Sequence, residues 1–260
     1  MKALFKRIVV DKENKIIKIR NAKNVEDKIN KIITKNDISS MVLSKDLYSL
    51  KDKLNCKVLT GERLLNLMLY DAIKKILELI NKDEANIHIS ILVNNNNGDI
   101  IDNVLELARE TKIINIVTEN ISQFLKVQEN IYNSYGVLIK ISNNKRKDLL
   151  RSDIIVNIDF SEEKINKYII NREAVIINVN NDSKIKDKKF VGINIKEYII
   201  KFPQNFKAEG FNPIHMYEAS IYDLSFKKAI EKLNKDSIHI MKFVGSNGAI
   251  AKEEFIRLNN

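Results

Sequence analysis

The residues best suited to chemistry lie in one strand–turn–helix segment, "IHISILVNNNNGDIIDNVLELA", residues 87–108. An apolar run leads into four asparagines and Gly98, and apolar residues at helical spacing follow. A glycine-rich turn at this place binds a dinucleotide pyrophosphate through backbone N–H groups at the start of the helix. An acidic residue about twenty positions later holds the ribose hydroxyls. The cofactor-binding candidates are Asn94, Asn95, Asn96, Gly98 and Glu119.

The turn departs from the pattern in its glycines. Asparagine tolerates the left-handed conformation that the first glycine supplies. Its side chain, however, fills space where phosphate oxygens would lie, and Asp99 adds a negative charge in the first turn of the helix. We therefore expect that the tight turn is kept and that its backbone N–H groups no longer bind a phosphate. For Glu119 two interpretations stay open, a ribose ligand and an exposed charge at a strand end.

Further polar residues end two later apolar runs. Asn157 and Asp159 follow "DIIV", and Asn178 follows "AVII". In a parallel sheet these residues would face one crevice, where amides could hold a small polar ligand. His215 is the single acid–base candidate, just after the loop between Pro203 and Pro213. With one cysteine, three histidines and no HExxH motif, the sequence predicts no metal site.

Residues 87–200 alternate between strand and helix patterns. Strands are predicted at 87–93, 113–118, 136–142, 153–159, 174–179 and 190–195. Helices are predicted to begin near Asp99, Ile121, Lys145 and Phe160. Continuous Val, Ile and Leu runs favour strands covered on both faces, as in a parallel sheet of right-handed βαβ units.

The flanking segments predict a second, smaller lobe. Residues 1–86 read as a β-β-α-β-β-α series that ends in one long apolar helix from residue 62. Residues 201–260 begin with the two prolines and contain a strong amphipathic pattern over 214–236, predicted to be one helix. We expect an α/β protein of two lobes, divided into 1–86, 87–200 and 201–260. The last segment is expected to pack back on the N-terminal lobe.

With the elements in place, residues 87–200 resemble the Rossmann domains of the shikimate dehydrogenase and methylene-tetrahydrofolate dehydrogenase group, also called amino-acid-dehydrogenase-like. The resemblance rests on the strand–turn–helix at 87–108 and on the strands "SDIIVNID" and "AVIINV". It implies NAD(P) as cofactor and a catalytic lysine and aspartate from the other lobe. Residues 1–86 do not contain the motifs of that pair.

Charge and composition limit the partners. The net charge is +10, and residues 1–86 alone hold 19 Lys and Arg against 12 Asp and Glu. The excess is mostly lysine and is not interleaved with aromatic residues, which weakens a nucleic-acid interpretation. The apolar run 64–80 is broken by charges, so no membrane span is predicted. A single cysteine and no recognisable signal peptide favour the cytoplasm.

Three functional hypotheses follow. The first is a non-catalytic or weakly active Rossmann-like protein that binds a small polar ligand, a nucleotide or a protein partner, including a second copy of itself. The second is an NAD(P)-dependent oxidoreductase that uses Glu119 for ribose and His215 for proton transfer. The third is a nucleic-acid-associated protein that uses the basic N-terminal lobe.

Overall fold

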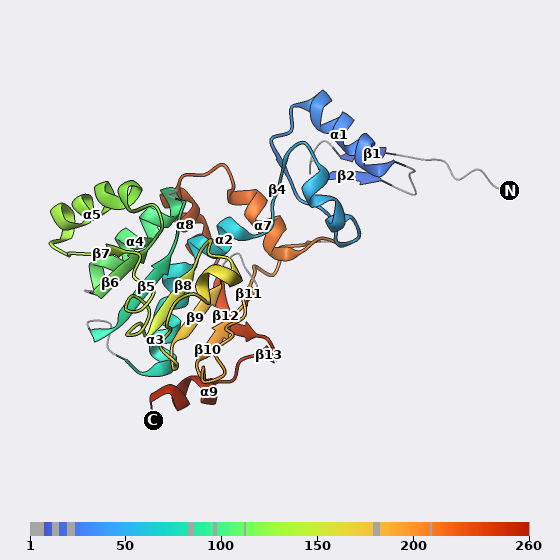
Figure 1. The fold of residues 1–260 in the computed structure, drawn as a ribbon. Helices are drawn as coiled ribbons and strands as arrows, with labels where there is room; N and C mark the ends of the chain where they lie inside the picture. The colour runs from blue at the N-terminus through green and yellow to red at the C-terminus, as the bar shows by residue number, and fades with distance from the viewer. Residues whose placement is uncertain are drawn as a thin grey trace. The chain divides into compact units, whose positions relative to one another are not determined.

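A computed structural model describes residues 8–11, 16–19, 24–82, 86–95, 98–111, 113–178, 183–208 and 210–259 (Figure 1). The chain forms two compact units. Unit 1 comprises Met1–Thr60 with Lys207–Ala219, and unit 2 comprises Gly61–Phe206 with Ser220–Asn260. The division at residues 86 and 200 predicted from the sequence stays a prediction.

Unit 2 contains a six-stranded parallel sheet. Its strands are β5 (His88–Leu92), β6 (Ile113–Val117), β7 (Lys140–Ser142), β8 (Ile154–Asn157), β9 (Val175–Asn178) and β10 (Ile193–Ile195). They lie side by side in the order β7-β6-β5-β8-β9-β10. Numbered along the chain, this order is 3-2-1-4-5-6, the Rossmann arrangement. The predicted α/β fold class with a Rossmann-like parallel sheet is confirmed.

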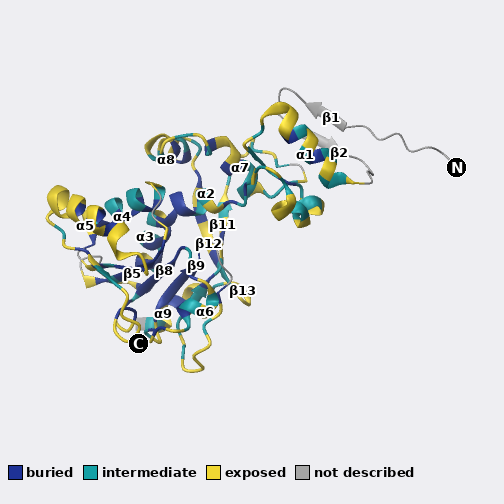
Figure 2. Cartoon of the chain, turned by 45° about the horizontal axis from the view of Figure 1, so that its top comes forward, coloured by how far each residue is buried: buried dark blue, intermediate teal, exposed yellow. Residues whose placement is uncertain are grey.

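The strands are apolar on both faces because both faces are covered. Every residue of β8 and β9 is buried (Figure 2). Alternate residues such as Ile155 and Ile176 pack with Phe160 and Ile165 in one hydrophobic cluster. Their neighbours along the strands point to the opposite face. This two-sided burial explains the unbroken apolar runs in the sequence.

Helices of unit 2 follow the predicted rhythm, with three corrections. The helices are α2 (Glu62–Leu67), α3 (Leu69–Ile80), α4 (Gly98–Glu110), α5 (Ile121–Tyr135), α6 (Glu162–Ile165), α8 (Phe226–Lys235) and α9 (Lys252–Ile256), followed by η3 (Arg257–Asn259). The long helix predicted from residue 62 is two helices, because Met68 leaves helical geometry at φ −86°, ψ 5°.

The second and third corrections concern turns. The helix predicted near Lys145 is a run of turns, in which the Asn144 carbonyl accepts the N–H groups of Lys147 and Asp148. The buried Asp148 holds these turns through the backbone N–H of Asn144 and an ion pair with Lys140. The helix predicted over 214–236 is also two helices, α7 (Pro213–Ile221) and α8, and Tyr222–Ser225 lies between them.

A second sheet in unit 2 was predicted only in part. β11 (Glu197–Lys201), β12 (His239–Gly245) and β13 (Gly248–Ala249) form an antiparallel three-stranded sheet. The sequence "FVGSNGAIAKEEF" has a strand–turn–helix pattern that predicts part of this sheet, whereas no pattern marks β11, which follows β10 after a single residue. β12 contacts β10 and α3, and α9 also contacts α3, so this C-terminal part extends the core of unit 2.

Unit 1 is the smaller α/β lobe. It contains the antiparallel pair β1 (Ile8–Asp11) and β2 (Ile16–Ile19), helix α1 (Val25–Asn36), the 3-10 helix η1 (Lys45–Lys53), and the parallel pair β3 (Ser40–Met41) and β4 (Lys57–Val58). The first residues of α7 belong to it. The return of the C-terminal segment to the N-terminal lobe, predicted from the sequence, stays a prediction. No helix within the described residues is long and apolar enough to cross a membrane.

Arg63 joins α2 and α4 to the last residues of α7 and the turn that follows them, all within unit 2. Its guanidinium donates to both carboxylate oxygens of Asp99 on α4, at 2.7 and 3.3 Å. It also donates to the carbonyl oxygens of Ile221 and Leu224 at 2.6 Å, and to that of Tyr222. These carbonyls are at the end of α7 and just beyond it, where a helix leaves acceptors without partners. Arg63 therefore caps α7, which explains why the predicted long helix ends there.

We expect Arg63→Ala to lower the free energy of unfolding by about 2–4 kcal/mol, because it leaves partly buried acceptors and Asp99 without their donor. Urea unfolding followed by circular dichroism measures the change. Lys167→Ala is the matched control, since its ion pair with Glu163 is exposed and should contribute less than about 1 kcal/mol. Equal losses in the two variants would contradict the capping role of Arg63.

Candidate functional site

The carboxyl edge of the parallel sheet gathers most of the residues predicted to bind a ligand. β8 is the neighbour of both β5 and β9, and Asn157 pairs in register with Leu92 on one side and Asn178 on the other. β6 lies on the far side of β5. Residues that follow these strands therefore meet at one edge, as the parallel order requires.

The turn after β5 is bound by a carboxylate from the turn after β8. The backbone N–H of Asn94 donates to Asp159 Oδ1 at 2.8 Å and to Oδ2 at 2.9 Å. The backbone N–H of Asn95 donates to Oδ2 at 2.8 Å, and its side-chain amide donates to the same oxygen at 3.1 Å. The first two N–H groups of this turn thus already bind an anion, which the chain supplies itself.

Asn94 also connects the turn to the end of β6. Its side-chain oxygen accepts the backbone N–H of Glu119 at 2.9 Å, and its carbonyl accepts the side-chain amide of Asn120 at 3.0 Å. Asn94 is buried, whereas Asn95 is exposed. The buried asparagine therefore has a structural role that a glycine could not fill. Asn96 lies outside the described residues.

Glu119 is exposed at the end of β6. Its carboxylate accepts a hydrogen bond from Lys164 Nζ at 2.7 Å, and this bond lowers the pKa of Glu119. Lys164 lies on α6, beyond β8, so the ion pair runs along the same edge of the sheet. No sequence pattern marked Lys164, because its pairing depends on the strand order.

Asn157 and Asn178 bond to each other and to the loop that follows β9. Asn157 Nδ2 donates to Asn178 Oδ1 and to the carbonyl of Phe160, both at 3.0 Å, while Asn157 Oδ1 accepts the N–H of Phe160. Asn157 Nδ2 also lies 3.3 Å from Ser183 Oγ. Asn178 Nδ2 donates to Asn194 Oδ1 on β10. Both predicted amides are buried and occupied by the protein itself.

Gly98 and Asp99 begin helix α4. Gly98 is not among the residues with positive φ, and a Cβ added to it would meet no described atom within 4 Å. Gly98 therefore provides neither a left-handed turn nor the close approach of another group to the backbone that would require a glycine. Asp99 forms the ion pair with Arg63, which gives it a role beyond capping its own helix.

The described residues do not fit a dinucleotide pyrophosphate. Two turn N–H groups that could bind an anion are bonded to Asp159, and a second carboxylate, Asp99, is in the first turn of α4. A phosphate at this place would displace Asp159 and lie among negative charges.

His215 belongs to unit 1, on α7, and its side chain is half-buried. Its ring stacks on Tyr48 with 5.6 Å between centroids. It hydrogen-bonds to the backbone of Thr60, and Nδ1 is buried with no hydrogen-bond partner in the described part of the chain. Burial lowers the pKa of the imidazole. This environment is that of a packed neutral histidine.

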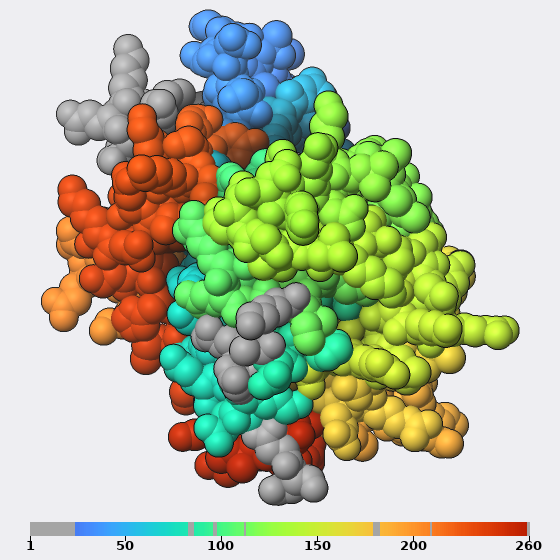
Figure 3. Space-filling model, turned by 90° about the vertical axis from the view of Figure 1, so that its left-hand side faces the viewer, coloured from blue at the N-terminus to red at the C-terminus, as the bar shows by residue number. Residues whose placement is uncertain are grey.

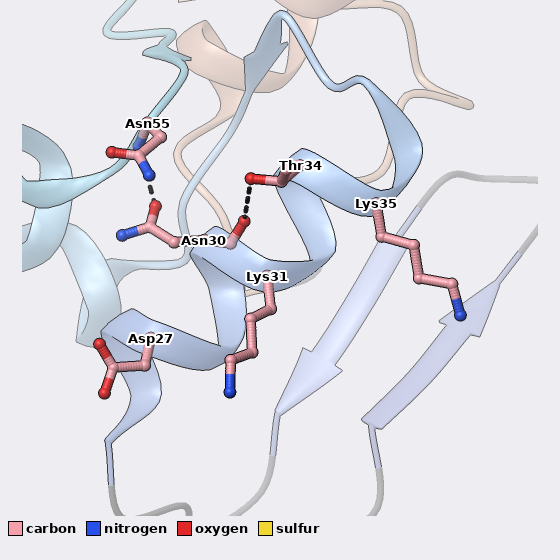
Figure 4. A pocket seen from close by; sticks show the side chains of 6 residues that line it. All are labelled: Asp27, Asn30, Lys31, Thr34, Lys35 and Asn55. Atoms are coloured by element: carbon pink, nitrogen blue, oxygen red, sulfur yellow. Dashed lines mark hydrogen bonds between the residues drawn. The ribbon is translucent and has the colours of Figure 1, made fainter.

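A polar groove of about 560 Å³ lies on α1 of unit 1 (Figure 4). Asn30 accepts the backbone N–H of Asn55 at 2.8 Å and donates to the carbonyl of Lys53 at 3.2 Å. The charged residues of the groove have mixed sign and are Asp27, Lys31 and Lys35. The groove therefore lacks a set of charges that converge on a ligand. No group of three or more His, Cys, Asp or Glu in the described residues could hold a metal ion.

Comparisons with solved structures find Rossmann-type enzymes. L-tryptophan dehydrogenase from Nostoc punctiforme has 10% identity over 82% of this chain and 72% of its own, with a TM-score of 0.37. Shikimate 5-dehydrogenase from Listeria monocytogenes, solved with shikimate and NAD, has 13% identity over 56% and 54%, with a TM-score of 0.32. Aspartate transcarbamoylase from Trypanosoma cruzi has 11% identity over 65% and 64%, with a TM-score of 0.32.

The match covers less than two thirds of the latter two enzymes. The Rossmann-type resemblance stated from the sequence is confirmed at the level of fold, by the strand order of the parallel sheet. No protein-family model matches the chain, and a comparison with curated proteins finds no match.

Gly98 offers a direct test of the turn. We expect Gly98→Ala to raise the free energy of unfolding by about 0.5–1 kcal/mol, because the site is helical and open. Gly192→Ala is the control, since its added Cβ would come 2.2 Å from the Ala174 carbonyl oxygen and should destabilise by about 1–3 kcal/mol. Urea unfolding compares the two. A loss of stability in Gly98→Ala would mean that this glycine serves a close approach.

The burial of His215 predicts a pH dependence. Its pKa is lowered in the folded protein, so the neutral ring contributes stability that is complete above the unfolded value of 6.5 and is lost as pH falls through the folded pKa. A ¹H–¹⁵N NMR titration should give His215 a pKa below 6.5, with His215→Gln used to assign the signal. A measured pKa above 6.5 would contradict the packed, neutral state.

Proposed function

We propose that this protein is a Rossmann-like binding protein without dehydrogenase activity, in which a carboxylate of the chain itself replaces the cofactor phosphate. The observation that carries the proposal is the set of hydrogen bonds from the N–H groups of Asn94 and Asn95 to Asp159. A carboxylate and a phosphate offer the same kind of charged acceptor to backbone N–H groups. The degenerate turn is then a turn that no longer needs a phosphate.

The residues proposed for catalysis support the same conclusion. A general base needs a free ring nitrogen within hydrogen-bond reach of its substrate. His215 has one nitrogen buried, and its ring is stacked on Tyr48. Glu119, proposed for ribose, is engaged by Lys164. For this protein to act as an oxidoreductase, the stacking of His215 on Tyr48 and the ion pair of Glu119 with Lys164 would both have to break.

The remaining polar atoms of the edge indicate what kind of binding is left. Glu119 and Asn95 are both exposed, and both are linked to Asn94: Asn95 follows it in the sequence, and the backbone N–H of Glu119 donates to its side-chain oxygen. Asn157 and Asn178 are buried. Any ligand at this edge would meet the exposed groups first. We therefore favour a small polar molecule or a protein surface over a nucleotide.

Ligand titrations test the proposal. We expect NAD, NADP and ADP at 1 mM to leave the melting temperature of the native chain unchanged, whereas a ligand at 100 times its Kd adds about 2.7 kcal/mol. Asp159→Ala should lose about 1–3 kcal/mol of stability, because two turn N–H groups lose a charged acceptor. Inorganic phosphate or ADP should then recover part of that loss, since the vacated N–H groups can bind an anion.

Asp153→Ala is the matched control. Asp153 immediately precedes β8, the strand that Asp159 follows. It accepts the backbone N–H of His88 at 3.0 Å and forms an ion pair with Lys82. Its removal should cost similar stability without any response to phosphate. Micromolar binding of NAD or NADP by the native chain, with turnover of a hydroxy acid, would overturn the proposal. An Asp159→Ala variant that ignores phosphate would show that Asp159 does not take the place of the anion.

A further inference from the structure

Helix α5 has two apolar faces. One face is buried and consists of Phe124, Val127 and Ile131. The other is exposed and consists of Ile121, Leu125, Tyr132 and Tyr135, each with 37–57% of its surface accessible. Five of the twelve exposed large hydrophobic residues of the described chain lie in the short stretch 121–138. Figure 3 looks onto this part of unit 2, where the yellow-green residues form the surface.

The exposed face has a regular spacing. Together with Gln128, its residues follow steps of four, three, four and three along the helix. At about 100° per residue they occupy an arc of about 80°, centred roughly 90° from the buried face. This spacing is that of the seam along which two helices pack against each other. We name these five residues the α5 stripe.

The α5 stripe is nearly symmetric about Gln128. Ile121 and Tyr135 lie seven residues to either side of it, and Leu125 and Tyr132 lie three and four residues to either side. In an antiparallel pair of α5 helices, Ile121 would therefore face Tyr135 of the second copy, and Leu125 would face Tyr132. A two-fold axis needs a surface that matches itself in this way.

Charge selects the antiparallel direction. Lys126 and Glu129 are the two charged residues of α5, both lie on the same side of the stripe, and neither forms an ion pair with the described residues. In the antiparallel pair, the two-fold axis is perpendicular to the plane that contains both helices. The side that carries Lys126 and Glu129 in one copy therefore lies next to the same side of the second copy. Lys126 then lies within about 1.5 Å of the axial level of the second copy's Glu129, one residue of helical rise. A parallel pair would place each charge opposite uncharged residues.

We propose that two copies of this chain associate through the α5 stripe, as an antiparallel, two-fold pair with reciprocal Lys126–Glu129 contacts. The four apolar residues with Leu138 expose on the order of 400–600 Å², the size of the largest apolar patch on a typical monomer and at least half of the roughly 800 Å² per partner in a standard interface. A helix with one positive and one negative residue also avoids the repulsion expected between two chains of charge +10. The inference is independent of the proposed function, because none of the α5 stripe residues bonds to Asp159.

Sedimentation velocity of the full chain, from 1 to 100 µM, tests the pairing. We expect the native chain to form a dimer, and we expect Leu125→Asp to raise the dissociation constant of that dimer at least a hundredfold. Ile169→Asp should leave it unchanged, since Ile169 is equally exposed at 51% but lies outside α5. Lys126→Glu and Glu129→Lys should each weaken the dimer about tenfold, because the two-fold axis repeats every contact. The double exchange should restore it.

Circular dichroism and thermal melting of each variant show whether it folds, and the exposed positions predict that all of them do. A native chain that stays monomeric at 100 µM would overturn the proposal. So would a dimer that survives Leu125→Asp. Single charge reversals that are not rescued by the double exchange would overturn the antiparallel direction.

Discussion

Backbone N–H groups at the end of a buried parallel strand must find acceptors, since the ladder has ended and water is scarce. At the end of β5, the central strand beside β8, the acceptor is the carboxylate of Asp159. In a dinucleotide-binding protein a phosphate of the ligand meets such groups. Here the acceptor is part of the chain, and much of the remaining structure of this edge depends on this contact between the turns after β5 and β8.

As a consequence, side chains at this edge of the sheet connect the turns to one another by hydrogen bonds. Asn94 connects the turns after β5 and β6, Asp159 connects those after β5 and β8, and Asn157 with Asn178 connects β8, β9 and the loop beyond. Asp99, the other carboxylate near the turn, is held by Arg63 together with the end of α7. The N–H groups of Asn94 and Asn95 therefore have a partner in Asp159, and satisfied buried networks hold a single arrangement.

A fold of this kind does not determine an activity. The Rossmann strand order explains where polar residues gather, but the contacts among them decide whether a ligand can enter. The α5 stripe illustrates the same separation. It uses the helix of the crossover between β6 and β7, and it adds a second apolar face that the sheet does not need for its own packing.

The sequence by itself determined the parallel sheet, because two-sided burial demands unbroken Val, Ile and Leu runs, and the helix patterns between those runs supply the crossovers that parallel strands need. It also placed Asn94, Glu119, Asn157 and Asn178 at one edge, since strand ends in such a sheet coincide. It did not reveal the cap that Arg63 supplies to α7 or strand β11, because each depends on partners distant in the chain. The break at Met68 was not predicted either. Only the tertiary structure decided that Asp159 lies within hydrogen-bond reach of Asn94: 65 residues separate them, and the neighbouring positions of β5 and β8 bring them together.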